Sequence, residues 1–126
     1  MNVALCCIGF LGLLIFGLGL RISLLRTSTN TIIGCKDDPT DTLYKWVRAH
    51  GNACEYAPIL GLLIYAAGMR GASGFMEFVA VAAVVSRYLH AAGMILSPSL
   101  DQPQPLRFAG AVGTYLTGVL LSLAVL

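Results

Sequence analysis

The stretch Arg48-Ala-His-Gly-Asn-Ala-Cys-Glu-Tyr-Ala-Pro58 leads directly into the apolar run Ile59–Met69. The uncharged segment Tyr56–Met69 is too short to cross a bilayer, which takes roughly 20 residues of helix. A spanning helix that ends at Met69 therefore starts near Ala49, and it carries the polar cluster to membrane depth or to the membrane edge. Ionisable groups at that depth are costly, and they are tolerated mainly where they face other protein or a wet cavity and serve a function.

The composition is that of an integral membrane protein with a single domain, residues 1–126. Of the 126 residues, 57% are hydrophobic and 11% are charged, whereas a soluble domain carries about 25% charged residues. The net charge of +2 is small and no basic stripe is interleaved with aromatics, so no nucleic-acid partner is expected. The cysteines contain no Cys-x-x-Cys pair, and we expect neither a disulfide framework nor a metal site; they are Cys6, Cys7, Cys35 and Cys54.

The pattern of apolar runs and turn residues predicts an all-α bundle of four transmembrane helices. Asp38-Pro39 fits an N-cap followed by proline at the first position of the second helix. The polar segment Thr27–Thr42 and the proline-rich segment Ser97–Leu106 are expected to be loops. The four helices are expected at Asn2 to about Leu25, from Asp38-Pro39 to Met69, at Phe75–Leu96 and at Phe108–Leu126.

The distribution of lysine and arginine predicts the orientation. The first loop and its borders hold most of the basic residues, and the third loop ends at Arg107, whereas the opposite side has only Arg70 and the amino terminus. Because basic loops stay in the cytoplasm, loops one and three are expected there and both termini outside.

In that orientation the polar residues of all four helices converge near the cytoplasmic side. Glu55 is about 21 Å from Met69 along its helix, and Arg87 is about 20 Å from Gly74 along the next, so Glu55 and Arg87 are expected to form a buried ion pair. Arg48, Asn52 and Glu55 share one face of their helix by their spacing. One acid cannot neutralise four arginines, and this excess of positive charge indicates an anionic ligand; the arginines are Arg26, Arg48, Arg87 and Arg107.

Other interpretations of the same residues stay open at this point. The polar side chains could have a purely structural role, in which they hold the helices together. His50 and His90 could ligate haem, and His50, Cys54 and His90 could hold a metal, although no ligand spacing supports the metal. Small residues on the fourth helix (Gly110, Gly113 and Thr117) and on the first (Gly9, Gly12, Gly17 and Gly19) fit either close packing within one subunit or an oligomer interface.

The Arg48–Pro58 stretch resembles the second-helix signature of the MAPEG superfamily, the membrane-associated proteins in eicosanoid and glutathione metabolism. The Arg87-x-x-His90-x-x-Gly93 run, the chain length and the four helices are also similar to that family, and the His-Gly-Asn triplet resembles its small bacterial branch. The resemblance implies a homotrimer in a bacterial inner membrane. It also implies that glutathione, as co-substrate, is bound between neighbouring subunits near the cytoplasmic face.

The resemblance also implies roles for individual residues. Arg26 and Arg48 would bind the glutathione carboxylates, while Asn52 and Glu55 would hydrogen-bond its γ-glutamyl end. The other matched positions are Tyr56 and His90 as ligand contacts and Arg107 as the catalytic arginine that stabilises the thiolate. Arginine forks suit carboxylates, and a nearby guanidinium favours the thiolate, which is the nucleophile.

One position departs from the resemblance. Met94 follows Gly93 where several catalytic members carry a tyrosine, and a thioether cannot donate the phenolic hydrogen bond. The expected function is a glutathione transferase or glutathione-dependent peroxidase that acts on small lipophilic electrophiles. The alternatives are a non-catalytic lipid- or glutathione-binding membrane protein on the same fold, and a small four-helix transporter.

Overall fold

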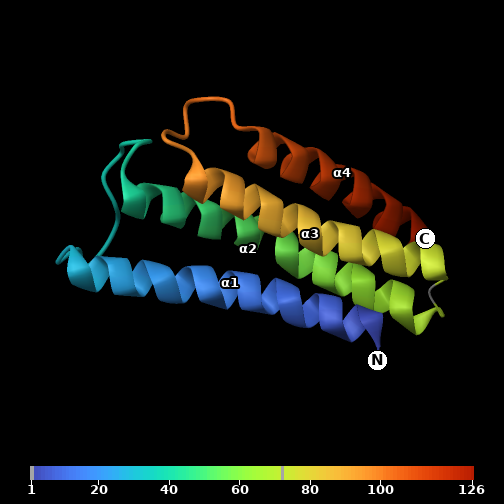
Figure 1. The fold of residues 1–126 in the computed structure, drawn as a ribbon. Coiled ribbons are helices and arrows are strands. Elements are labelled where there is room, and N and C mark those ends of the chain that lie inside the picture. The colour runs from blue at the N-terminus through green and yellow to red at the C-terminus, as the bar shows by residue number, and fades with distance from the viewer. Residues whose placement is uncertain (1, 72) are drawn as a thin grey trace.

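The structure is a computed structural model that describes residues 2–71 and 73–126 as a bundle of antiparallel helices. Figure 1 shows the helices side by side along one axis, with the marked N and C ends of the chain together at one end of the bundle. The predicted all-α fold is confirmed, and the predicted helix ends are close to those observed. The helices are α1 (Val3–Ser28), α2 (Thr42–Met69), α3 (Gly74–Leu96) and α4 (Pro105–Val125).

The start of α2 differs from the sequence prediction. Asp41 is the N-cap, and its carboxylate accepts a hydrogen bond from the Tyr44 amide at 2.9 Å. The predicted Asp38 cap is wrong, because the Asp38 carboxylate instead accepts bonds from the Thr40 hydroxyl at 2.7 Å and the Thr40 amide at 2.8 Å. These bonds hold the pKa of the Asp38 carboxyl below its usual range. Asp38 thus forms a local turn that precedes the helix, which is a common alternative for aspartate.

α2 and α3 lie in the middle of the bundle. α1 packs against both of them and α4 packs against both of them, while α1 and α4 make no contact with each other in the described part of the chain. The α1–α2 and α3–α4 loops lie at the same end of the bundle, opposite the termini (Figure 1). The loops touch there, since the Leu100 amide donates to the Pro39 carbonyl at 3.0 Å. Lys45 of α2 adds a contact to the second loop, because its Nζ donates to the Ser97 carbonyl at 3.0 Å.

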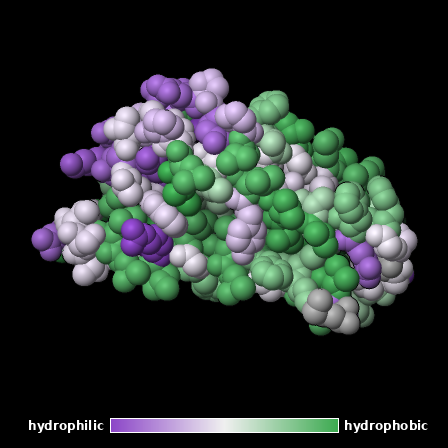
Figure 2. Space-filling model, in the orientation of Figure 1, coloured by the Kyte–Doolittle hydropathy of each residue, from purple (hydrophilic) through white to green (hydrophobic). Residues whose placement is uncertain are grey.

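The apolar surface marks an integral membrane protein. α1, α3 and α4 are each long and apolar enough to cross a membrane. α2 is not in this group; it contains the polar cluster, so its span of the membrane stays a prediction. In Figure 2 hydrophobic side chains cover the middle of the molecule and hydrophilic ones gather at the end that holds the two loops.

Small residues let the helices approach closely. The buried face of α2 carries Ala49, Ala53 and Ala57 at intervals of four residues. A methyl group added at Gly110 of α4 would lie 2.7 Å from the Cα of His90 on α3, closer than real Cβ atoms come to any atom. The small residues of α4 therefore serve packing within one chain, whereas Gly9, Gly12 and Gly17 of α1 have no neighbour within 4 Å of a Cβ added there.

We expect Gly110→Ala to destabilise the bundle, since the new methyl group meets backbone that cannot move aside. The cost of such overpacking is about 1–3 kcal/mol, which should lower the thermal unfolding midpoint in detergent. Gly118→Ala on the same helix is the matched control, because its methyl group would meet only a Leu60 side-chain carbon at 3.7 Å. Equal midpoints for the two variants would contradict the packing described here.

Candidate functional site

The guanidinium of Arg87 lies at the centre of the polar site. Arg87 is only 1% exposed, and its Nη2 donates to Asn52 Oδ1 of α2 at 2.7 Å. Its Nη1 donates to Thr114 Oγ1 of α4 at 3.4 Å, and its Cζ lies 5.1 Å from the centroid of the Tyr56 ring. The Nε atom is buried with no hydrogen-bond partner among the described residues. One cation from α3 thus joins three helices and keeps one donor unsatisfied.

Glu55 reaches Arg87 through Asn52. Asn52 Nδ2 donates to Glu55 Oε2 at 3.5 Å while Asn52 Oδ1 accepts from Arg87. Among the described residues no Arg87 nitrogen lies within ion-pair distance of a Glu55 oxygen, so the predicted direct pair is corrected to a relay. The physical reason is that Asn52 lies one turn from Glu55 on the same face, and its amide offers both an acceptor and a donor.

Tyr56 forms a second link from α2 to α4. Its hydroxyl lies 3.3 Å from the Tyr115 hydroxyl, and the two rings meet edge to face with centroids 5.9 Å apart. The sequence analysis did not select Thr114 or Tyr115. Helical rise could have selected Thr114. At 1.5 Å per residue, Thr114 and Arg87 lie at nearly the same distance from the end of the bundle that holds the chain termini.

The outward face of α2 is open. Arg48 and Glu55 are both exposed, and Asn52, half-buried, lies between them on the same side of the helix. No hydrogen bond from Arg48 to another described residue is present. The polar face therefore continues from the buried Arg87 to the surface of the bundle, and it presents both a cation and an anion there.

Arg107 and His90 form a separate group where α4 begins. Arg107 Nη1 donates to the Leu100 carbonyl at 2.8 Å and Nη2 donates to the Gln102 carbonyl at 3.0 Å. The His90 ring lies 2.9 Å, through Nδ1, from the Arg107 carbonyl. The guanidinium thus holds the α3–α4 loop. A groove of about 630 Å³ lies beside it, lined by His90, Pro103, Gln104, Pro105, Arg107, Phe108 and Ala111.

Arg26 also lies apart from the Arg87 cluster. It ends α1, and its Nη2 donates to the Gly34 carbonyl in the following loop at 3.4 Å. Its Nε is buried with no hydrogen-bond partner among the described residues. Asn52, Glu55, Tyr56 and Arg87 thus lie together in this structure, whereas Arg26 and Arg107 each bind loop carbonyls within this chain.

The two histidines pack against different helices. His50 contacts α1, since a Cβ added at Gly19 would lie 3.4 Å from its Nε2, while His90 contacts α4 at Gly110. Residues 2–71 and 73–126 contain no group of three or more metal-ligating side chains, so neither the haem nor the metal interpretation gains support.

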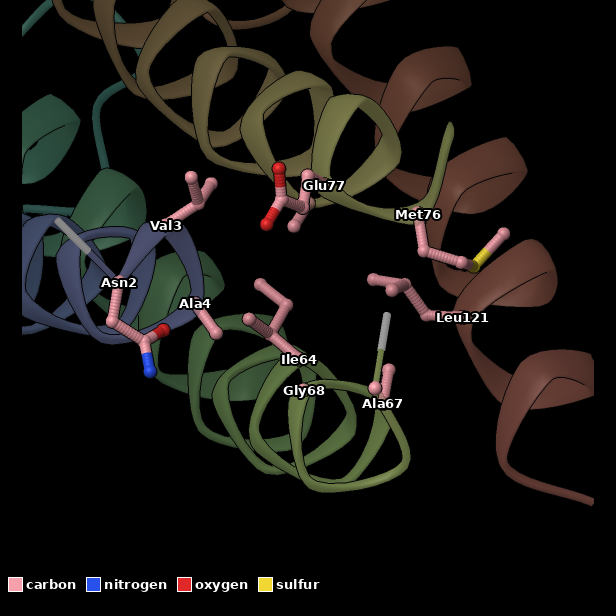
Figure 3. A pocket seen from close by; sticks show the side chains of 11 residues that line it. Asn2, Val3, Ala4, Ile64, Ala67, Gly68, Met76, Glu77 and Leu121 are labelled. Atoms are coloured by element: carbon pink, nitrogen blue, oxygen red, sulfur yellow. The ribbon is translucent and has the colours of Figure 1, made fainter. Parts of the chain in front are cut away.

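A further cavity lies at the other end of the bundle. It has a volume of about 340 Å³ and is lined from all four helices, including Val3, Ile64, Glu77 and Leu121. Figure 3 shows Glu77 beside this cavity among mostly apolar side chains. None of the predicted site residues lines it, so the candidate site remains the polar end near Arg87.

We expect Arg87 to be coupled more strongly to Asn52 than to Glu55. Asn52→Ala leaves a buried guanidinium nitrogen without its acceptor, which costs about 1–3 kcal/mol. Glu55→Gln changes an exposed side chain and should cost about 0.5 kcal/mol or less.

Double-mutant cycles with Arg87→Met, read from unfolding midpoints in detergent, test this difference. Substantial coupling is expected for the pair with Asn52 and little for the pair with Glu55. Equal coupling for both pairs would instead favour the direct ion pair.

The comparisons with known proteins agree with the fold. Residues 4–126 match the MAPEG family, which is essentially the whole chain. No curated protein matches the sequence closely enough to serve as a relative. The described residues form four helices, three of them long and apolar enough to span a membrane, which agrees with a membrane bundle of this kind. The chain therefore belongs to the MAPEG family, as an integral membrane protein of the eicosanoid and glutathione metabolism type.

Proposed function

We propose that the protein binds glutathione at the polar end of the bundle and uses it to conjugate, or to reduce, small lipophilic electrophiles or hydroperoxides. The observation that carries this proposal is the open polar face of α2. Arg48 and Glu55 are exposed on a helix that packs among apolar spans. Charged groups facing lipid are costly, and a zwitterionic ligand or a second copy of the chain removes that cost.

Glutathione fits the chemistry of this face. Its two carboxylates suit the guanidinium groups of Arg48 on this face and of Arg26 from a neighbouring copy, since arginine binds carboxylates through two parallel hydrogen bonds. The ammonium group of its γ-glutamyl end suits the carboxylate of Glu55, and the carboxylate of the same end can accept from the second N–H of the Asn52 amide. Tyr56 borders the same face of α2 and supplies an aromatic contact.

Arg107 has a different proposed role, the stabilisation of the glutathione thiolate. The thiolate is the nucleophile, so a guanidinium near the sulfur favours the reactive form. In the present conformation the guanidinium binds the Leu100 and Gln102 carbonyls. These two contacts use two of the five N–H donors of the guanidinium, so the others remain for the sulfur. The neighbouring groove, which His90 also lines, would admit the apolar reactant.

The proposal includes a homotrimer with the ligand between neighbouring subunits and with loops one and three in the cytoplasm of a bacterium. The site of a single chain is open on one side, since Arg48 and Glu55 are exposed and Arg26 lies apart from Arg87. A neighbouring copy would supply the missing wall. α1 presents large exposed apolar side chains such as Phe16, which suits either lipid or another copy.

A non-catalytic glutathione-binding protein is the second candidate, and Met94 favours it. Met94 is buried and its thioether offers no hydrogen-bond donor. If Arg107 does not reach the sulfur, the site would hold glutathione without activating it. Binding without turnover is the result that separates this candidate from the enzyme.

We expect reduced glutathione to bind the detergent-purified protein, as measured by calorimetric titration. Arg48→Ala should weaken binding about tenfold or more, since a charge-assisted hydrogen bond contributes about 1.5–3 kcal/mol. Arg70→Ala, at the opposite end of the bundle, is the matched control and should bind like the wild type.

Arg107→Ala should keep most of the binding but lower the ultraviolet signal of the thiolate and any conjugation of an apolar electrophile. An absence of wild-type binding at millimolar glutathione would refute both the enzyme and the glutathione-binding candidate.

We expect the protein in mild detergent to contain three copies of the chain. Light scattering corrected for bound detergent gives the mass, and chemical crosslinking should stop at a band of three subunits. A monomer at the concentrations used for the titration would contradict the shared site, even if glutathione still binds.

A further inference from the structure

The cavity at the end of the bundle that holds the chain termini has no part in the proposed glutathione chemistry. Its volume is about 340 Å³. Small-molecule sites have volumes of about 300–1,000 Å³. Benzene occupies an engineered cavity of about 150 Å³, so this space suits one ligand about twice the size of benzene.

The walls of this cavity come from all four helices of one chain. Ile64 of α2, Ala80 of α3 and Leu121 of α4 are buried, and Val3 and Ala4 of α1 line the remaining side. The open polar face of α2 lies at the opposite end of the bundle. A neighbouring copy that meets that face would leave the walls of this cavity unchanged.

The cavity has a polar rim above an apolar floor. Glu77 lies about 4.5 Å along α3 from Gly74, and Figure 3 shows its side chain extending from α3 into the cavity. Ala80 of the floor lies about 9 Å from Gly74 along the same helix. Glu77 is exposed, so a ligand can reach the carboxylate from water and place its apolar part deeper in the bundle.

The charge of the lining selects the kind of ligand. Glu77 is the charged residue among the described residues that line the cavity, and Arg70, in the connection from α2 to α3, does not line it. The carboxylate makes no hydrogen bond or ion pair within residues 2–71 and 73–126. An acid in the first turn of a helix stabilises that helix, but this role needs no apolar cavity beside the carboxylate. The combination fits a cation that carries an apolar group.

We propose that this cavity binds a lipophilic primary amine in its ammonium form. The ammonium donates a charge-assisted hydrogen bond to the Glu77 carboxylate. The apolar group packs against Ile64, Ala80 and Leu121, where it leaves water. A neutral molecule of the same shape keeps only the apolar contacts, and an anion is repelled by the carboxylate. This binding does not depend on the proposed function.

The test is calorimetric titration of the full chain in detergent, without glutathione, with heats from empty micelles subtracted. The probe is 2-phenylethylamine, which is protonated at neutral pH. The neutral comparison is 2-phenylethanol, and the anionic comparison is 3-phenylpropanoate. The amine should bind about tenfold or more tightly than the alcohol, since a charge-assisted hydrogen bond is roughly twice as strong as a neutral one. The anion should show no binding.

Variants test the place of the site. Glu77→Gln keeps the shape of the side chain but removes its charge, so the amine should bind about tenfold or more weakly while the alcohol binds as before. A purely structural role of Glu77 would not separate the two ligands. Asp101→Asn is the matched control, because it removes an exposed acid at the other end of the bundle and should leave both affinities unchanged. Ala80→Leu fills the floor and should weaken both ligands.

Three outcomes would overturn the proposal. They are no binding of the amine to the wild type, equal affinities for the amine and the alcohol, and a preference for the amine that survives Glu77→Gln. The comparison at Glu77 decides the matter alone if Ala80→Leu does not fold. Because glutathione is absent throughout, failure of this proposal is independent of failure of glutathione binding.

Discussion

The arrangement of the bundle depends on one buried cation. A guanidinium at the depth of Arg87 is stable only if neighbouring helices supply acceptors, and here α2 supplies Asn52 while α4 supplies Thr114. These two hydrogen bonds fix the positions of α2 and α4 along the bundle axis relative to α3. Apolar packing alone would define these positions less sharply, because lipid-facing and core-facing side chains are chemically alike in a membrane.

The same cation explains the position of the polar face of α2. Asn52 uses its oxygen for Arg87, so its amide nitrogen turns toward Glu55, and Glu55 remains exposed. The Tyr56 ring covers the guanidinium and its hydroxyl meets Tyr115. The buried charge thus orients a row of polar side chains whose outer members, Arg48 and Glu55, are free to meet a ligand or a second chain.

The sequence predicted the helices well because long apolar runs, prolines and polar loops mark their ends directly. It placed the second cap at Asp38 because an aspartate before a proline and Asp41, three residues later, carry equal cap signals. Helical rise placed Glu55 and Arg87 at the same depth along the bundle axis, but it gives this depth only to about one helical turn. Asn52 lies within one turn of Glu55, so the rise alone did not show which of the two contacts Arg87. The carbonyl contacts of Arg26 and Arg107 depend on loop conformation, which no periodic pattern encodes.

The close contact between α3 and α4 divides the chain into regions of opposite mutational tolerance. At Gly93 and Gly110 even a methyl group collides with the backbone of the facing helix, so these positions accept no side chain without backbone movement, and at Gly113 it collides with the Ser86 side chain. On α1 the reverse holds: Phe16 is 79% exposed and Leu13 is 66% exposed. Contact with lipid or with a flat apolar partner places little constraint on the shape and volume of these side chains. Selection therefore acts on side-chain volume along the α3–α4 contact and on hydropathy alone along the outer face of α1.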